Sequence, residues 1–400
     1  MLKTIDEKAN IIYGDLSLQH NLKLEFKGSN NIVFFAGSSF CIDIIYHQNN
    51  SLVFVGDNAG LYWGGGARIE ISNDSVCYIG NNTTFERVCM NALESKHIII
   101  GNDCMFSWDI WLDTNDHHMI FNDNYERINI AKSIYLGDHI WFARELAILK
   151  GSFIASGSIL GAKSVNSGIK FSNTIYAGNP SKLIKENSFW DRKHTPNLTK
   201  EQVRRYVAMK KDDYNFEFEK DKFLDPNLLE KELEKLESAA EKLEFVYDYI
   251  YNNTYKNRFA LFKDSDTSEC KLYKDESKIP FSKLKFEELP KKGALSLVEN
   301  HLSYKLGLAL IENSKNMKAL IKIPFILYRI KKEHTQLIKA NLEDFDDYEE
   351  ALKCKNTLCY KLGSALIKAH KNWYKGGYVK FYFEVLKIKK DFKQNNPKLL

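Results

Sequence analysis

Two adjacent histidines, His117 and His118, are the residues of this chain best suited to acid–base chemistry. A neutral imidazole accepts a proton near pH 7, so it can act as a general base in a cytoplasmic reaction. Short units of an aliphatic residue, glycine and two polar residues flank the pair, at 79–82, 100–103 and 136–139. The histidines are out of step with these units, and proteins break a local pattern mainly where function requires it. We therefore expect the chemistry at residues 114–120.

The flanking units predict a β-helix. In each unit the aliphatic residue would fill the interior, the glycine would allow a tight backbone path, and the polar residues would turn outward. Strand-like runs at 31–35, 51–56, 67–71 and 97–101 are separated by polar turns, and the large aliphatic residues Ile154 and Leu160 are six positions apart. These features predict a β-solenoid over residues 1–190, in which stacking of the coils supplies the stability.

The sequence changes character after Pro180. Residues 181–222 resemble a connector that packs back on the solenoid, and Asp225-Pro226 is a typical helix start. The next apolar positions have the heptad spacing of a coiled-coil seam: Leu229, Leu233, Leu236, Ala240, Leu243, Tyr247 and Ile250. One alternative is a helix that joins subunits, and the other is a helix packed on its own subunit. Residues 191–255 are therefore predicted to be a connector and a heptad-patterned helix.

The last part of the chain contains an internal repeat. Residues 302–311 match 358–367 at an offset of 56, and the two repeat units extend over 302–332 and 358–390. Each unit has the pattern of an amphipathic helix followed by a basic, aromatic-rich one. Residues 256–400 are therefore predicted to form an α-helical domain.

The bulk composition excludes several classes of protein. The chain has 400 residues with a net charge of +5, too small to indicate nucleic-acid binding, and it carries no nucleic-acid motif. Its seven cysteines are scattered without zinc spacing, so no metal is expected. The first residues contain no signal-peptide pattern, and no apolar run approaches the roughly 18 residues that span a bilayer. These observations predict a cytoplasmic protein.

Four motifs, in order, resemble the hexapeptide-repeat acyltransferases, which are left-handed β-helix enzymes. Within that family the likeness is greatest to the glycan O-acetyltransferases, including those that modify sialic acid. The motifs are Thr114-Asn115-Asp116-His117-His118-Met119-Ile120, Glu126-Arg127-Ile128-Asn129, Leu136-Gly137-Asp138-His139-Ile140-Trp141 and Ala177-Gly178-Asn179-Pro180-Ser181-Lys182. The resemblance implies an N-terminal left-handed parallel β-helix, followed here by the α-helical C-terminal domain.

The resemblance assigns chemistry to the first motif. A sugar hydroxyl must lose its proton as it attacks a thioester, and by position in the family motif His118 would be the general base. Asp116 would orient or polarise it, and His117 would be a neighbouring competitor on the acceptor side of the site. The alternative is that both are solvated loop histidines. Arg127 would bind an acidic acceptor through a two-pronged contact or serve as a structural salt-bridge partner.

The resemblance also implies acetyl-CoA as the co-substrate, without a metal. Trp141 would lie against the acyl or CoA end of the site or simply pack in a coil, and Ala143 and Ala162 would leave room for the pantetheine arm. Lys182 and Lys185 would pair with CoA phosphates or form a solvated basic edge. The chain departs from the family in having Trp141-Phe142-Ala143 for Trp-Ile-Gly and Val165-Asn166 for Thr-Lys. Both departures lie in the expected CoA groove, so they affect the donor contacts more than the acetyl transfer.

These expectations describe an acetyl-CoA-dependent O-acetyltransferase that acts on a bacterial surface-glycan sugar such as sialic acid. Related enzymes are trimers with active sites between neighbouring β-helices, so a homotrimer is implied. The alternatives are an N-acyltransferase of a nucleotide amino sugar and a non-catalytic glycan-assembly scaffold. The C-terminal domain would dock on the inner-membrane surface, a lipid-linked glycan or another assembly enzyme, or be an ordinary helical bundle.

Overall fold

A computed structural model describes residues 1–61, 65–193, 195–205, 213–288, 298–299, 301–313, 330, 348–372 and 377–395. The chain divides into two compact units, Met1–Glu288 and Leu289–Leu400. Each unit is described by itself.

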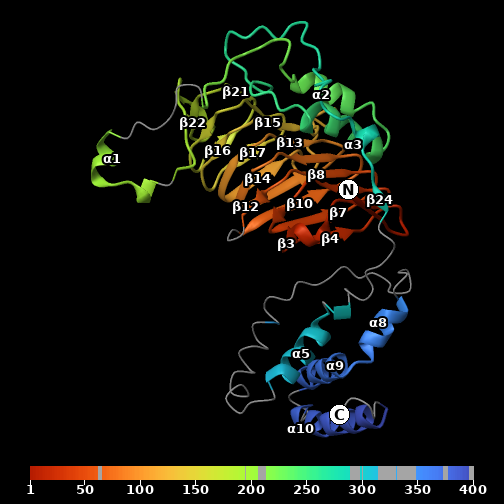
Figure 1. Ribbon diagram of the computed structural model, residues 1–400. Coiled ribbons are helices and arrows are strands. Elements are labelled where there is room, and N and C mark those ends of the chain that lie inside the picture. Colours follow the sequence, from red (N-terminus) through yellow and green to blue (C-terminus); the bar gives the residue numbers. More distant parts are fainter. Residues whose placement is uncertain are drawn as a thin grey trace. The chain divides into compact units, whose positions relative to one another are not determined.

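The first unit is a β-solenoid of three sheets whose strands stack coil upon coil (Figure 1). The ten-stranded sheet contains β1 Leu2–Ile5, β2 Ile11–Tyr13, β5 Ile32–Phe35, β8 Leu52–Val55, β11 Val76–Ile79, β13 Ile98–Ile100, β15 Ile134–Leu136, β18 Phe153–Ile154, β21 Ile169–Lys170 and β24 Glu287–Glu288. The eleven-stranded sheet contains β4 Lys23–Phe26, β7 Ile42–Tyr46, β10 Gly66–Ile71, β12 Thr84–Ala92, β14 Met105–Asp113, β16 Trp141–Phe142, β17 Ala147–Leu149, β19 Ile159–Leu160, β20 Val165–Asn166, β22 Ile175–Ala177 and β23 Lys182–Lys185. A three-stranded sheet contains β3 Gln19–His20, β6 Ser39–Phe40 and β9 Ala59–Gly60.

The register shows the six-residue sides that the sequence predicted. Three successive short strands, β15, β16 and β17, each pair in parallel with a strand of the next coil, namely β18, β19 and β20. In each pair the partner residue is 18 positions later, as for Tyr135, Trp141 and Ala147. The spaced aliphatic residues Ile154 and Leu160 are both fully buried in the solenoid core. The prediction of an N-terminal left-handed β-helix followed by a helical C-terminal region is confirmed.

The polar residue after each glycine forms a ladder along one corner of the solenoid. The backbone N–H of Asp57 donates to Asn81 Oδ1 at 2.7 Å, that of Asn81 to Asn102 Oδ1 at 2.8 Å, and that of Asn102 to Asp138 Oδ1 at 2.6 Å. The N–H of Asp138 donates to Ser156 Oγ at 2.9 Å. We expected these residues to turn outward, and for Asp138 this is wrong, since Asp138 is buried. Its burial is compatible with folding because the ladder satisfies the hydrogen-bonding groups of the turn.

The glycine of each unit allows close approach between coils. A Cβ atom on Gly101 would lie 2.6 Å from the carbonyl carbon of Gly137, and one on Gly137 would lie 2.6 Å from the backbone nitrogen of Ser156. Any larger residue would force neighbouring coils apart, so the repeated glycine follows from the inter-coil spacing.

Short helices cover the outer face of the ten-stranded sheet. They are α2 (Pro226–Leu233), α3 (Ala239–Phe245) and the π-helical segment η3 (Val246–Tyr251). Figure 1 shows α2 and α3 lying on the solenoid beside β8, β13 and β15. The heptad positions Leu229, Leu233, Leu243, Tyr247 and Ile250 belong to one buried cluster with residues of this sheet. The pattern therefore packs on its own subunit, which was the second of the two alternatives. The predicted seam position Ala240 is exposed, and Ala239 is buried in its place, because the pattern is interrupted before α3.

The single long helix expected over this region is interrupted between α2 and α3. Ser238 caps α3 by accepting from the backbone N–H of Glu241, while the Glu241 carboxylate accepts from the N–H of Ser238 at 2.9 Å. This capping box fixes a helix start inside the heptad pattern. The break lets α2 and α3 follow the curved surface of the solenoid.

A buried ion pair attaches the segment after η3 to the solenoid. The Arg258 guanidinium is fully buried and donates to both carboxylate oxygens of Asp138, at 2.8 and 2.7 Å. Arg258 also donates to the carbonyl oxygen of Asn253 at 2.6 Å and to that of Ile250. Residues 250–258 are thus fixed to the same corner ladder.

The second unit is helical where it is described, but it begins at Leu289 and not at residue 256 as predicted. Residues 256–288 contain no α-helix and belong to the first unit, because Phe259, Leu261 and Phe281 pack in the same apolar cluster as the ten-stranded sheet. The helices of the second unit are α5 (Leu302–Asn313), α8 (Tyr348–Lys355), α9 (Leu358–Lys371) and α10 (Gly377–Asn395). The matching parts of the two repeats are α5 and α9, and they pack on each other. The rest of the first repeat, 314–329 and 331–332, and the aromatic stretch 373–376 lie outside the described residues.

The two repeat glycines lie where α5 and α9 cross. A Cβ on Gly307 would lie 1.6 Å from the Cys359 carbonyl oxygen, and a Cβ on Gly363 would lie 1.7 Å from that of Ser303. Gly307 and Gly363 are equivalent positions of the repeat, 56 residues apart, and so are Ser303 and Cys359, so the contact is reciprocal. The internal repeat therefore forms a pseudo-symmetric helix pair.

The remaining short helical elements of the first unit are η1 (Leu16–Leu18), η2 (Thr195–Asn197), α1 (Lys200–Arg205) and η4 (Phe281–Lys283). Across the described parts of both units, no helix has the length and apolar character to cross a bilayer.

Candidate active site

The predicted catalytic motif occupies an enlarged corner between β14 and β15. Ile98 of β13 pairs with Ile134 of β15, 36 residues later, whereas Tyr135 pairs with Phe153 only 18 residues later. The longer coil contains residues 114–133, which leave the sheet at Asp113 and return at Ile134. The sequence prediction of an irregular insertion at this point is confirmed.

The insertion folds into a finger that projects from the solenoid. Phe121 and Arg127 form an antiparallel bridge, and the N–H of Ile128 donates to the Ile120 carbonyl oxygen at 2.9 Å. The turn is closed by Asn122, whose side-chain oxygen accepts from the N–H of Glu126 at 3.0 Å. Tyr125 at the tip is 90% exposed. The finger therefore places an apolar and aromatic surface in solvent beside the two histidines.

Asn129 connects the two arms of the finger. Its side-chain oxygen accepts from the N–H of Ile120 at 2.8 Å. Its amide nitrogen donates to Asp116 Oδ2 at 2.9 Å and to the backbone carbonyl oxygen of His118 at 2.7 Å. Since Asn129 is itself buried, these three hydrogen bonds hold both candidate catalytic residues at a defined place.

The Asp116 carboxylate forms an ion pair with Lys150, which comes from the next coil. The hydrogen bond from the Lys150 ammonium, assisted by that from Asn129, holds the pKa of Asp116 below its ordinary value. The His118 side chain is exposed and makes no hydrogen bond or ion pair to any residue that the structure describes. The predicted role of Asp116 toward His118 stays a prediction.

His117 is held differently from its neighbour. Its backbone is left-handed, with φ of 59°, and its Nε2 lies 3.4 Å from Asp113 Oδ1. Of the two histidines, His118 is therefore the one whose ring makes no hydrogen bond or ion pair with the described part of the subunit. This distinction agrees with the assignment of His118 as base and His117 as its competitor, which itself stays a prediction.

Arg127 forms an ion pair with Glu94 at 2.8 Å. Burial alone would raise the pKa of Glu94, but hydrogen bonds from Asn115 and Arg127 lower it below its ordinary value. This is the structural salt bridge that was one of the two alternatives for Arg127. A direct contact with an acidic acceptor stays a prediction.

The residues assigned to acetyl-CoA lie along neighbouring strands at the C-terminal coils. Trp141 in β16 is 37% exposed, and Ala143 follows it, next to Gly161 and Ala162 of the adjoining coil. Lys182 and Lys185 are exposed on β23, which runs antiparallel to β22. The predicted outward placement of the two lysines is therefore observed.

The two predicted sets lie at different ends of β14. Trp141 pairs beside Met105 at the start of that strand, whereas the insertion leaves from Asp113 at its end. Within the described residues of one subunit, no hydrogen bond or ion pair joins the His118 side chain to Trp141, Lys182 or Lys185. A site that used both sets would therefore need a second solenoid beside the first.

Sequence reasoning missed Lys150 and Asn129. Asn129 was noted only as the last residue of the second motif, and Lys150 lies in a different coil. Only the coil register, which brings Leu149 beside Asp113, could have placed Lys150 near Asp116. No group of histidine, cysteine and acidic residues with metal-binding geometry occurs in the part of the chain that the structure describes.

Comparison with known proteins separates the two regions of the chain. Residues 197–394 match a family described as a domain of unknown function, DUF8374. A polysialic acid O-acetyltransferase of Neisseria meningitidis is 31% identical over 184 residues, which cover 44% of this chain and 83% of that protein. A polysialic acid O-acetyltransferase of Escherichia coli O1:K1 / APEC is 31% identical over 125 residues, which cover 31% of this chain and 41% of that protein. The chain thus matches less than half the length of the latter relative.

Solved structures are similar to the same region. The polySia-specific acetyltransferase NeuO is 29% identical with a TM-score of 0.43, covering 49% of this chain and 92% of that chain. The polysialic acid O-acetyltransferase OatWY is 26% identical with a TM-score of 0.43, covering 51% of this chain and 98% of that chain.

Proposed function

The chain belongs to the hexapeptide-repeat acyltransferases that include the polysialic acid O-acetyltransferases, and on this premise we propose that it transfers an acetyl group from acetyl-CoA to a sugar hydroxyl. The proposed acceptor is an acidic bacterial surface glycan such as one that contains sialic acid. The observation that carries the proposal is the exposed, uncommitted imidazole of His118 on a finger ordered by Asn129.

In the proposed reaction, His118 removes the proton from the acceptor hydroxyl as its oxygen attacks the thioester carbonyl. The carbon–sulfur bond then breaks, the acetyl group remains on the sugar oxygen, and the proton reaches the departing CoA sulfur. The thioester is already activated, so the chemistry assigned to this chain is proton transfer and positioning. Asp116, held by Lys150 and Asn129, is assigned a positioning role, because Asn129 joins its carboxylate to the backbone carbonyl oxygen of His118.

The assignment of the CoA-binding residues is supported by their arrangement. Lys182 and Lys185 are exposed cations on one edge strand, and they offer point charges to phosphates. A Cβ on Gly161 would lie 2.8 Å from the Ala177 Cβ, so the coils beside Ala143 and Ala162 are closely spaced and carry small side chains. We propose that the pantetheine arm lies along these coils, with Trp141 at its acyl end.

We further propose that the enzyme is a homotrimer. One subunit presents His118 and the CoA-binding edge at opposite ends of β14, so apposition of a second solenoid would complete the site. Exposed tryptophans on that strand, Trp108 and Trp111, offer apolar surface for such an interface.

Adjacent histidines supply a matched test. Labelled acetyl-CoA would be incubated with sialylated glycans and with amino-sugar nucleotides, and the products identified by mass spectrometry. We expect O-acetylated sialylated product from the wild type, a loss of about 10²–10⁴-fold in turnover for His118→Ala, and a change within about tenfold for His117→Ala. CoA binding and oligomeric state should be equal in both variants.

Unchanged turnover in His118→Ala would refute the assigned base. Acetylation of amino-sugar nucleotides alone would instead favour N-acyl transfer, and the absence of turnover with intact CoA binding would favour the scaffold. For the C-terminal unit, docking on an anionic membrane surface stays a prediction. Its described helix α10 exposes Tyr382, Phe383 and Leu386, and flotation of the full chain with anionic liposomes tests that docking.

A further inference from the structure

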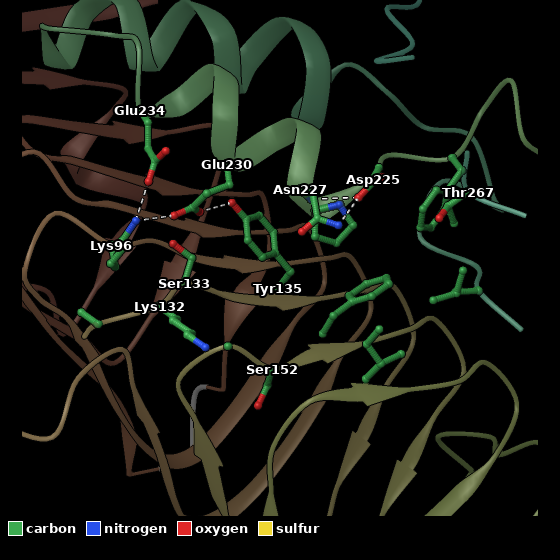
Figure 2. Close-up of a pocket in the computed structure, with 17 residues that line it drawn as sticks. Lys96, Lys132, Ser133, Tyr135, Ser152, Asp225, Asn227, Glu230, Glu234 and Thr267 are labelled. Carbon is green, nitrogen blue, oxygen red and sulfur yellow. Dashed lines mark hydrogen bonds and ion pairs between the residues drawn. The ribbon is translucent and has the colours of Figure 1, made fainter. Parts of the chain in front are cut away.

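A cavity of about 410 Å³ lies between the solenoid and α2, on the other side of the corner that carries the catalytic finger. Figure 2 shows Asp225, Asn227, Glu230 and Glu234 on the helix side of the cavity and Lys96, Lys132 and Ser152 on the solenoid side, with Lys96 extending toward the two glutamates. Its volume is typical of a small-molecule site, which is usually an apolar pocket with a few polar groups. The helix belongs to the segment that follows the solenoid, so this cavity is formed only because that segment packs back.

Three of the five charged side chains that line the cavity form one ion-pair cluster, in which Lys96 serves both Glu230 and Glu234. The Lys96 ammonium donates to Glu230 at 2.8 Å and also pairs with Glu234, and the Tyr135 hydroxyl donates to the other Glu230 oxygen at 2.6 Å. Lys132 is exposed and has no hydrogen-bonding or ionic partner for its ammonium among the residues that the structure describes. Among the described residues that line the cavity, Lys132 is therefore the cation left to pair with a ligand.

The opposite wall offers hydrogen-bond acceptors and the floor is aromatic. Asp225 uses Oδ1 to cap α2 through the N–H of Asn227 at 2.8 Å, which leaves its second carboxylate oxygen available to a ligand. Phe153 and Phe223 lie 6.2 Å apart between ring centroids and close the base of the cavity. A sugar has C–H faces that pack on aromatic rings and hydroxyls that donate to carboxylates, so this combination suits a saccharide.

The cavity is connected to the catalytic finger through the backbone. The N–H of Lys132 donates to the carbonyl oxygen of Thr114, where the finger begins, at 2.9 Å. Gly151 lines the cavity and directly follows Lys150, the partner of Asp116. A polymer with one unit at His118 would therefore have neighbouring units beside this corner.

We propose that the cavity is a second acceptor subsite, which binds an acidic sugar unit of the glycan with its carboxylate on Lys132 and its hydroxyls toward Asp225. This inference rests on the proposed function for the identity of the glycan. The subsite would favour polymeric acceptors over single sugars, because a second contact on the same chain raises the effective concentration of the first.

Binding of a sialic acid oligomer to the full chain without acetyl-CoA tests the subsite independently of turnover. By calorimetry, Lys132→Gln should weaken binding by about three- to tenfold, as for loss of a charge-assisted hydrogen bond at a partly exposed site. Ile169→Trp should weaken it similarly, because Ile169 is 55% exposed at the cavity and a larger side chain would fill the opening. Lys8→Gln and Leu18→Trp are the matched controls, since both side chains are exposed on the first coils.

An oligomer whose sugar carboxyl groups have been reduced to alcohols tests whether binding depends on the charge of the carboxylate or only on the shape of the sugar. It should bind the wild type about as weakly as native oligomer binds Lys132→Gln, and it should be insensitive to that substitution. The subsite would be overturned if the wild type did not bind the native oligomer. It would also be overturned if both cavity variants bound the native oligomer as tightly as the wild type does. Lys132-dependent binding without any acetyl transfer would sustain the subsite while refuting the proposed function.

Discussion

Asn129 offers the most direct test of how the catalytic finger is ordered. Its side chain makes four hydrogen bonds: it accepts from the Ile120 N–H and from Arg127 Nε, and it donates to the Asp116 carboxylate and the His118 carbonyl oxygen. Asn129→Ala removes all four without touching the solenoid core. We therefore expect the solenoid to fold normally and the finger to lose its fixed conformation.

The magnitude follows from the kind of bonds that are lost. A neutral hydrogen bond contributes about 1 kcal/mol and one to a charged group about 1.5–3 kcal/mol, and water replaces part of each on an exposed finger. A net loss of about 2–3 kcal/mol corresponds to about 30- to 150-fold in the ratio of ordered to disordered finger. Because misplacement of a reacting group by about 1 Å costs on the order of 100-fold, kcat should fall by at least about tenfold.

Asn122→Ala is the matched control, because the Asn122 side chain makes three hydrogen bonds in the same finger. They go to the N–H groups of Asn124 and Glu126 and to the Glu126 carboxylate, at the tip and away from Asp116 and His118. Initial rates of CoA release at saturating acetyl-CoA and acceptor should change by less than about threefold in this variant, a difference of about 0.6 kcal/mol. Equal losses in the two variants, or full kcat in Asn129→Ala, would refute the positioning role.

Three further changes probe other contacts. Lys150→Met should raise the pKa of Asp116 toward its ordinary value, and a carboxyl-carbon NMR titration measures this shift. In the wild type, the depressed pKa stabilises the fold at pH values above the unfolded-state pKa, and this stabilisation is lost as the pH falls through the folded-state pKa. The variant should lack this pH-dependent stabilisation. Arg258→Met should lower the free energy of unfolding in urea by about 3–5 kcal/mol by leaving the Asp138 carboxylate buried without its partner, and adding Asp138→Asn should restore part of the loss. Gly363→Ala should lower hydrogen-exchange protection of α5 and α9, because the new Cβ would lie 1.7 Å from a carbonyl oxygen of α5; unchanged protection would contradict that crossing.

The repeated units made the solenoid predictable. Glycine is required where neighbouring coils approach, and large aliphatic residues such as Ile154 and Leu160 must recur where six-residue sides face the interior. Both requirements are local, so they leave a pattern in the sequence. The insertion was visible for the same reason, since it interrupts that pattern between Asp113 and Ile134.

Contacts between coils were not predictable in the same way. Lys150 reaches Asp116 because the extra residues of one coil bring different chain segments into register. His139 was expected to face outward like other turn residues, but its ring stacks between Trp190 and Tyr214 at centroid distances of 4.0 and 3.7 Å. Both residues acquire their surroundings from segments 34 or more positions away, and no spacing rule encodes such partners.

The heptad pattern was compatible with a helix that joins subunits or with a helix packed on its own subunit, and the composition of the strands under it distinguishes the two. Runs such as Ile32–Phe35 and Leu52–Val55 are apolar at every position, and every residue in them is buried. A strand exposed on one face would alternate with polar residues, so these runs require a cover on their outer side as well as a core. The heptad positions from Leu229 to Ile250 provide that cover. Since the seam is used within the subunit, an oligomer must be built on another surface.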